Sequence, residues 1–139
     1  MSPPSAAKTF GYSGTPLVKK LGIKEGLRFQ FVFAPRTFRA LLGRLPKATA
    51  VDEGALDFAV LFVKSQAVLA KEFPGLRDRL VSNGTLWVSW PKRASGVVTD
   101  LTEGIVRDYG LGAGLVDVKV CAIDDTWSGL KFVRRLKDR

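Results

Sequence analysis

The most constraining feature of the sequence is the apolar segment at residues 56–63 (LDFAVLFV), which is broken by a single aspartate. A run this apolar is typical of a strand buried on both faces, as in a parallel sheet covered by helices. Ser65 then opens a long helical pattern, and Asn83 and Gly84 predict a turn into a second strand over residues 85–90. Strand, helix and strand in this order predict a βαβ unit of an α/β fold.

The same alternation continues on both sides of this unit. The other expected elements are a helix over residues 16–21 capped by Thr15, strands over 27–33 and 48–51 with a helix over 35–45 between them, a helix over 99–109 opened by Thr99 or Asp100, and a hairpin of strands over 115–123 and 127–135. Together they predict a three-layer, Rossmann-like α/β fold: a mostly parallel sheet with helices on both faces and a C-terminal antiparallel hairpin. We expect residues 1–9 to be a flexible tail and residues 10–139 to form one domain.

The charge of the chain is positive and unevenly distributed. The formal net charge is +9, and residues 1–48 contain nine Lys and Arg against one acid, whereas the remaining residues contain thirteen against twelve. Such asymmetry favours an anionic partner, which would be a phosphorylated small molecule, an acidic protein or a nucleic acid. The alternative is a basic surface that keeps the protein in solution.

The sequence also excludes some chemistry. It has no histidine and one cysteine, Cys121, so zinc chemistry is close to excluded and we expect no bound cofactor or metal. Asp124 and Asp125 offer oxygen ligands for magnesium, but adjacent acids usually form turns. The single cysteine fits a reducing compartment, and no apolar run approaches the roughly 20 residues of a membrane-spanning helix. We therefore expect a cytoplasmic protein without membrane contact.

Three stretches of the sequence are distinctive. They are GYSGTPL (residues 11–17) with KKLG (19–22), WPK (90–92) with SG (95–96) and DLTE (100–103), and VDVKVCA (116–122) with TWSGLK (126–131). Together they resemble a bacterial family catalogued as domain of unknown function 3052, over nearly the whole chain after the expected tail. That resemblance implies no established activity.

A second resemblance concerns residues 57–90 and 115–135. Their order of buried strand, helix, Asn-Gly turn, strand, helix and hairpin is similar to the later half of Rossmann-like methyltransferases. Where those enzymes have a Gly-rich loop after the first strand, this chain has Ala34, Pro35 and Arg36. Pro35 has no N–H to donate and Ala34 carries a Cβ, so we do not expect S-adenosylmethionine to bind in the usual manner.

The first candidate site is the loop before the helix expected at residue 99. Its assigned residues are Trp90, Lys92, Arg93, Ser95, Gly96 and Thr99. The loop follows the carboxyl end of a strand, and a helix start there offers free N–H groups, so the arrangement suits a phosphate or carboxylate. The alternative is an ordinary basic loop, because the Asp100 carboxylate would satisfy the same N–H groups.

Two further candidate sites have a less specific sequence pattern. Ser13, Thr15 and Lys19 combine hydroxyls with positive charge near a helix start, but they do not have P-loop spacing, and the alternative is a segment that only docks on the domain. Trp127 follows the hairpin turn, where it would either stack on a ligand ring or pack at the edge of the core.

No residue set has a spacing that commits the chain to catalysis. The sequence therefore favours a non-enzymatic binding or interaction module for an anionic ligand or acidic partner. The alternatives are a cofactor- or nucleotide-using enzyme related to methyltransferases and a non-specific nucleic-acid-binding protein. A third alternative is a purely structural role through a homodimer formed by the terminal hairpin edge.

Overall fold

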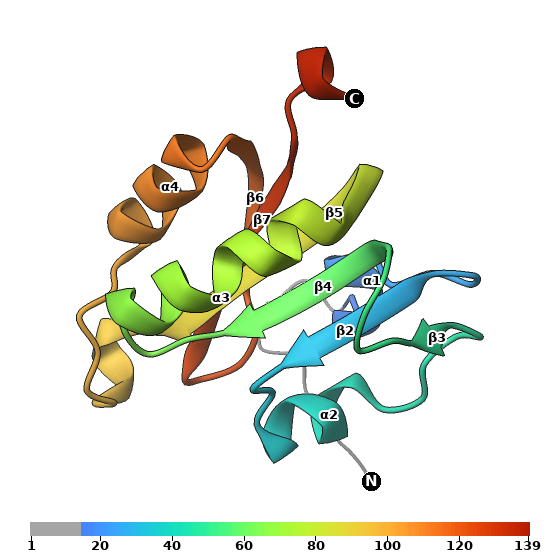
Figure 1. Cartoon of the computed structure of the whole chain (residues 1–139). Helices are drawn as coiled ribbons and strands as arrows, with labels where there is room; N and C mark the ends of the chain where they lie inside the picture. The colour runs from blue at the N-terminus through green and yellow to red at the C-terminus, as the bar shows by residue number, and fades with distance from the viewer. Residues whose placement is uncertain (1–14) are drawn as a thin grey trace, which may run out of the picture.

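The computed structural model describes residues 15–139 and is built on a six-stranded sheet with the order β3-β2-β4-β5-β7-β6 (Figure 1). The strands are β2 (Arg28–Val32), β3 (Thr49–Ala50), β4 (Leu56–Phe62), β5 (Leu80–Pro91), β6 (Leu115–Ala122) and β7 (Trp127–Arg134). Strands β3, β2, β4 and β5 are parallel, and β7 runs antiparallel to β5 and β6. The expected fold class is confirmed. The tail expected at residues 1–9 lies outside the described residues.

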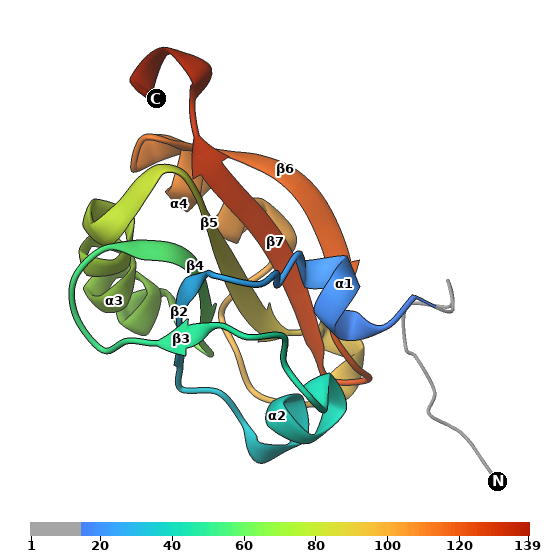
Figure 2. The same cartoon turned by 90° about the vertical axis from the view of Figure 1, so that its right-hand side faces the viewer.

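Helices cover both faces of the sheet, as Figure 2 shows. Helices α1 (Leu17–Leu21) and α2 (Arg36–Leu42) pack on one face, and α3 (Gln66–Arg79) and α4 (Glu103–Gly112) pack on the other. We call these the α1/α2 face and the α3/α4 face. Two short 3₁₀ helices, η1 (Arg93–Ser95) and η2 (Leu136–Asp138), complete the described chain. Strand β4 lies between the two layers of helices, and its side chains alternate between the two cores, which explains its almost continuous apolar sequence.

The prediction of a turn at Asn83 and Gly84 is wrong, because both residues lie inside β5. The pairing of β5 with β4 is irregular here, since Leu56 pairs with Leu80 but Phe58 pairs with Thr85, so β5 carries extra residues at this point. A Cβ on Gly84 would lie 3.1 Å from the carbonyl oxygen of Leu56, which explains why glycine occupies this position.

The helix expected to begin at Thr99 or Asp100 begins at Glu103 instead. The Thr99 hydroxyl donates to the carbonyl of Lys64 at 2.7 Å, and the Asp100 carboxylate accepts the N–H of Gln66 at 2.8 Å. Both side chains thus tie the loop to the start of α3. Thr102 caps α4 by accepting the N–H of Ile105.

The first helix also begins later than expected. Helix α1 starts at Leu17, and Pro16 rather than Thr15 occupies its N-cap position, where no side chain accepts a hydrogen bond. The helix ends as predicted, because Gly22 adopts a left-handed conformation with φ of +88°.

The strand order changes direction between β2 and β4. The chain leaves β2 through α2 and adds β3 on one side, whereas it leaves β4 through α3 and adds β5 on the other. In open α/β sheets, ligands bind outside the carboxyl ends of the strands at such a switch point. The described residues therefore place a candidate site between the ends of β2 and β4.

Candidate functional site

A crevice lies at this switch point and has a volume of about 500 Å³, within the range of small-molecule sites. Its lining residues are Phe33, Pro35, Phe62, Val63, Lys64, Val68, Lys71, Glu72 and Trp127. They come from the ends of β2 and β4, the first turns of α3 and the start of β7. The crevice is thus built mostly on regular elements, which hold its side chains in place.

The apolar part of the crevice is rigid. Phe62 and Trp127 are both buried, and their rings meet edge to face with centroids 5.1 Å apart. Val63, which follows β4, is also buried. These side chains offer an apolar surface against which a ring or hydrocarbon portion of a ligand would pack.

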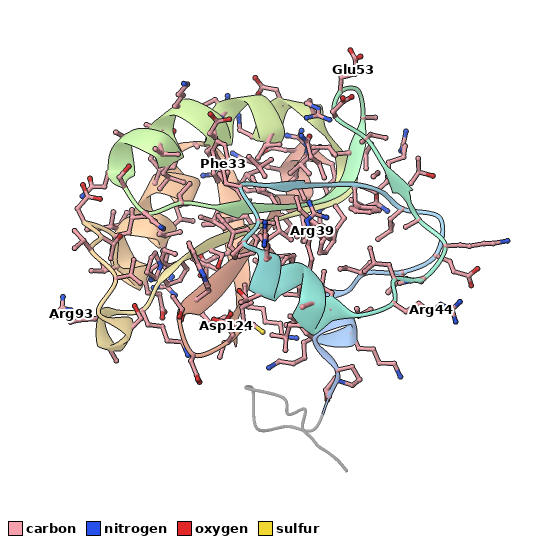
Figure 3. The ribbon with its side chains drawn as sticks, turned by 90° about the horizontal axis from the view of Figure 1, so that it is seen from below. Phe33, Arg39, Arg44, Glu53, Arg93 and Asp124 are labelled. Carbon is pink, nitrogen blue, oxygen red and sulfur yellow. The ribbon has the colours of Figure 1, made fainter. Side chains whose placement is uncertain are left out.

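Phe33 has an unusual backbone conformation at the mouth of the crevice. Its φ is +60°, and among the described residues it is the one non-glycine residue with positive φ. Its side chain is 60% exposed, so packing against the protein does not compensate for the strain of about 1–3 kcal/mol. Figure 3 shows Phe33 at the end of β2, between α2 and α3. A strained, exposed aromatic ring at a crevice is typical of a ligand-binding residue.

The charged part of the crevice consists of Lys64, Lys71 and Glu72. Lys64 lies in the connection between β4 and α3, and the other two lie one to two turns into α3. Within residues 15–139, neither lysine takes part in an ion pair. Two of the first N–H groups of α3 are already used, because the Ser65 hydroxyl accepts from Val68 and the Asp100 carboxylate accepts from Gln66. A bound anion would therefore be held by the two ammonium groups.

The loop assigned to the anion from the sequence forms a separate pocket of about 420 Å³. Arg93, Gly96 and Thr99 line it together with residues 97, 98 and 100–102. The Ser95 hydroxyl donates to the Lys92 carbonyl and accepts the N–H of Val97. The hydroxyls of Ser95 and Thr99 and the start of α4 thus have partners within the protein. Anion binding at this loop stays a prediction.

The remaining predicted site residues lie in different parts of the fold and do not form one site. Trp90 is buried in the core of the α3/α4 face and does not line the crevice. Lys19 is exposed on α1, Thr15 is half-buried just before that helix, and Ser13 lies outside the described residues. Trp127 both packs in the core of the α1/α2 face and lines the crevice, so the two interpretations of this residue are compatible.

Phe33, Lys64 and Lys71 were not among the site residues predicted from the sequence. Lys64 has a recognisable signal, since it is the first charged residue after a buried strand. Phe33 has no such signal, because nothing in the local sequence predicts a positive φ for phenylalanine.

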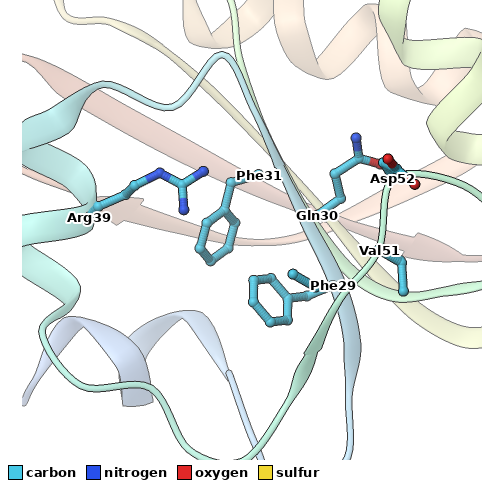
Figure 4. Close-up of a pocket in the computed structure, with 7 residues that line it drawn as sticks. Phe29, Gln30, Phe31, Arg39, Val51 and Asp52 are labelled. Atoms are coloured by element: carbon cyan, nitrogen blue, oxygen red, sulfur yellow. The ribbon is translucent and has the colours of Figure 1, made fainter.

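A further pocket of about 340 Å³ lies beside the part of β2 that the short strand β3 does not pair with (Figure 4). The guanidinium of Arg39 stands 5.3 Å from the centroid of the Phe31 ring in a cation–π arrangement. Gln30 accepts a hydrogen bond from Arg79 at 2.6 Å. Asp52 follows β3 and lines this edge pocket, and it is not among the residues that line the crevice.

The acidic side chains of residues 15–139 do not assemble a metal site. No group of three or more potential metal-ligating side chains occurs in this part of the chain. Asp124 accepts the N–H groups of Thr126 and Trp127, both at 2.8 Å, so its carboxylate shapes the hairpin turn.

The helices of the described chain are all short or partly polar. None of those within residues 15–139 combines the length and apolar character needed to cross a membrane.

Comparison with known proteins identifies the fold but no family. No protein-family model matches the sequence, and no curated protein resembles it significantly. The resemblance to the bacterial family of unknown function stays a prediction.

Several solved structures of methyltransferases are similar in fold. One is a SAM-dependent methyltransferase from Aquifex aeolicus, with 15% identity, a TM-score of 0.62, and coverage of 84% of this chain and 86% of that one. Another is the magnesium protoporphyrin IX methyltransferase of Synechocystis with bound SAH, with 11% identity, a TM-score of 0.57, and coverage of 86% and 78%. Fibrillarin of Aeropyrum pernix with bound S-adenosyl-L-methionine has 17% identity, a TM-score of 0.51, and coverage of 88% and 70%. The described chain therefore has a Rossmann-like fold similar to that of SAM-dependent methyltransferases.

Proposed function

We propose that this protein is a binding module for a small anionic ligand that combines a flat or apolar portion with a phosphate or carboxylate. The crevice between β2 and β4 would hold it. The observation that carries the proposal is Phe33, a strained and exposed aromatic residue at the switch point of the sheet. Phe33 would stack on the flat portion, Trp127 would form the floor, and Lys64 and Lys71 would pair with the anion.

The residues around the crevice favour a ligand other than S-adenosylmethionine bound in the manner of the methyltransferases. Phe33, Ala34 and Pro35 occupy the position of the Gly-rich loop, so side chains stand where the cofactor would approach the backbone. The acid after β3, Asp52, lines another pocket. Residues 51–55 alone connect β3 to β4, whereas a complete mononucleotide-binding half has a second helix and a third strand there.

A methyltransferase-related enzyme is the second candidate function, and the fold likeness favours it. Under that alternative, S-adenosylmethionine itself would stabilise the protein. It is therefore included among the ligands of the test.

The test is thermal unfolding of the purified protein with AMP, adenosine, inorganic phosphate or S-adenosylmethionine. A ligand at 100 times its dissociation constant adds about 2.7 kcal/mol, which raises the melting temperature of a domain of this size by several degrees. We expect AMP, which joins a ring to a phosphate, to give a larger shift than adenosine or phosphate alone. Binding of S-adenosylmethionine in place of AMP would favour the enzyme.

The charge-neutral variant K64Q/K71Q tests the site. We expect about a tenfold loss of AMP affinity, since two partly exposed ion pairs contribute about 1.4 kcal/mol together. The matched control K47Q/K137Q removes the same charge away from the crevice and should bind as the unmodified protein does. Equal AMP affinity in K64Q/K71Q, or no shift with any ligand of this class, would contradict the proposal.

A further inference from the structure

The two faces of the sheet differ sharply in charge. Residues 17–47, which include α1 and α2, contain eight basic residues and one acid. Helices α3 and α4 contain four basic and four acidic residues, and three of the four ion pairs of the described chain involve these two helices. The excess charge of the sequence is therefore gathered on the α1/α2 side, where Arg44 extends outward after α2 (Figure 3).

Further positive charge lies on the strands that α1 packs beside, β6 and β7 (Figure 2). Lys119 of β6 and Lys131 of β7 are directly opposite each other in the antiparallel register. Directly opposed like charges destabilise a sheet. The Lys119 ammonium donates to the carbonyl of Lys20 at 3.1 Å, which fixes it against the end of α1.

Lys24, in the loop after α1, belongs to the same cluster. Partial burial and the positive charges of Lys119 and Lys24 lower the pKa of Lys131. Within residues 15–139, no acid forms an ion pair with any of these three lysines. Within the described residues the fold thus holds three ammonium groups near one another without an ion-pair partner, which is a local conflict typical of functional sites.

We propose that the cluster of Lys24, Lys119 and Lys131 binds the phosphodiester backbone of a nucleic acid, with the basic residues of α1 and α2 extending the contact surface. This inference does not depend on the proposed function of the crevice, because no residue is shared between the two sites. Closely spaced phosphates would supply the missing counter-charge, and each neutralised phosphate releases condensed counterions.

The same surface is poorly suited to a protein partner. Protein interfaces have an apolar centre and few lysines. The exposed large apolar residues are Phe33, Val98, Leu111, Val118, Val120 and Leu136, and none of them lies on α1, on α2 or in the Lys24 loop. Val118 and Val120 flank Lys119 in β6, but Val120 is paired with Leu130 of the α3/α4 core and so points to the opposite face of the sheet. Pairing of β6 edges from two copies would also bring further lysines toward the cluster.

The experiment measures binding of a fluorescent duplex DNA of roughly 20 base pairs by anisotropy at several salt concentrations. Because each phosphate contact contributes about 0.9 to the slope of log K against log salt, K24Q/K119Q/K131Q should reduce that slope by about 2–3. The control R135Q/K137Q/R139Q removes the same charge in and beside η2, outside both proposed sites, and should leave most of the slope intact. The cluster variant should melt no lower than the unmodified protein, because it removes like-charge repulsion.

Three results would overturn the inference. One is no binding of the duplex at low salt, and another is an equal loss of slope in the cluster and control variants. The third is binding of polyglutamate as tight as that of the duplex at the same salt, which would indicate an acidic protein partner. The AMP response of the cluster variant reports separately on the crevice and should be unchanged.

Discussion

Replacement of Trp87 by alanine is expected to lower the free energy of unfolding by about 4 kcal/mol. Trp87 is fully buried at the centre of the core that joins α1 and α2 to the sheet. Its indole N–H donates to the carbonyl of Leu21 at 2.9 Å, which fastens the end of α1. The alanine variant loses both the packing and this hydrogen bond. Urea denaturation measures the combined decrease in the free energy of unfolding.

The W87F variant is the matched control. It keeps most of the apolar contact but leaves the buried carbonyl of Leu21 without its donor, which costs about 1–3 kcal/mol. Gly129 packs under the indole, since a Cβ there would lie 3.1 Å from the ring. A change of less than about 1 kcal/mol in W87A would mean that α1 is not held to the sheet by this contact.

Replacement of Phe33 by alanine or by glycine is expected to distinguish the effect of the ring on ligand affinity from the effect of the positive φ on stability. Both variants remove the ring, so both should lose about tenfold in affinity for an aromatic anion such as AMP, in line with about 1–3 kcal/mol for stacking. Glycine also relieves the positive φ, so F33G should be about 1 kcal/mol more stable than F33A.

The relevant measurements are AMP titration and urea denaturation of both variants. If Phe33 were a structural residue, F33A would lose several kcal/mol of stability and F33G would not recover it. If Phe33 did not contact the ligand, both variants would bind AMP as tightly as the unmodified protein.

The regular elements were predictable because each has a strong local pattern. The apolar run at β4, the Ser65 cap of α3 and the two strands of the terminal hairpin all identify their elements without tertiary information. The errors occurred where distant contacts override local preference. Asn83-Gly84 is a turn signal in sequence but lies in an irregular part of the β4–β5 pairing. Thr99 and Asp100 are capping residues by type, but they bond to Lys64 and to the first residue of α3 instead.

The site was less predictable than the fold. Trp127 was identified from its position after a turn, but its place in the crevice depends on the order of β7 relative to β4. The lysine cluster depends on the register that brings Lys119 opposite Lys131 and on the packing of α1. Neither relation is encoded in local spacing, so the positive charge is visible in the sequence but its arrangement in space is not.

The most direct test of the central claim is a titration of isotope-labelled protein with AMP, followed by ¹H–¹⁵N correlation NMR. We predict that the largest shift changes fall on the amides of Phe33, Lys64, Val68 and Lys71 and on the indole N–H of Trp127, which together line the crevice. Changes gathered instead on residues 93–102 or 50–52, or no changes at saturating AMP, would contradict a ligand site between β2 and β4.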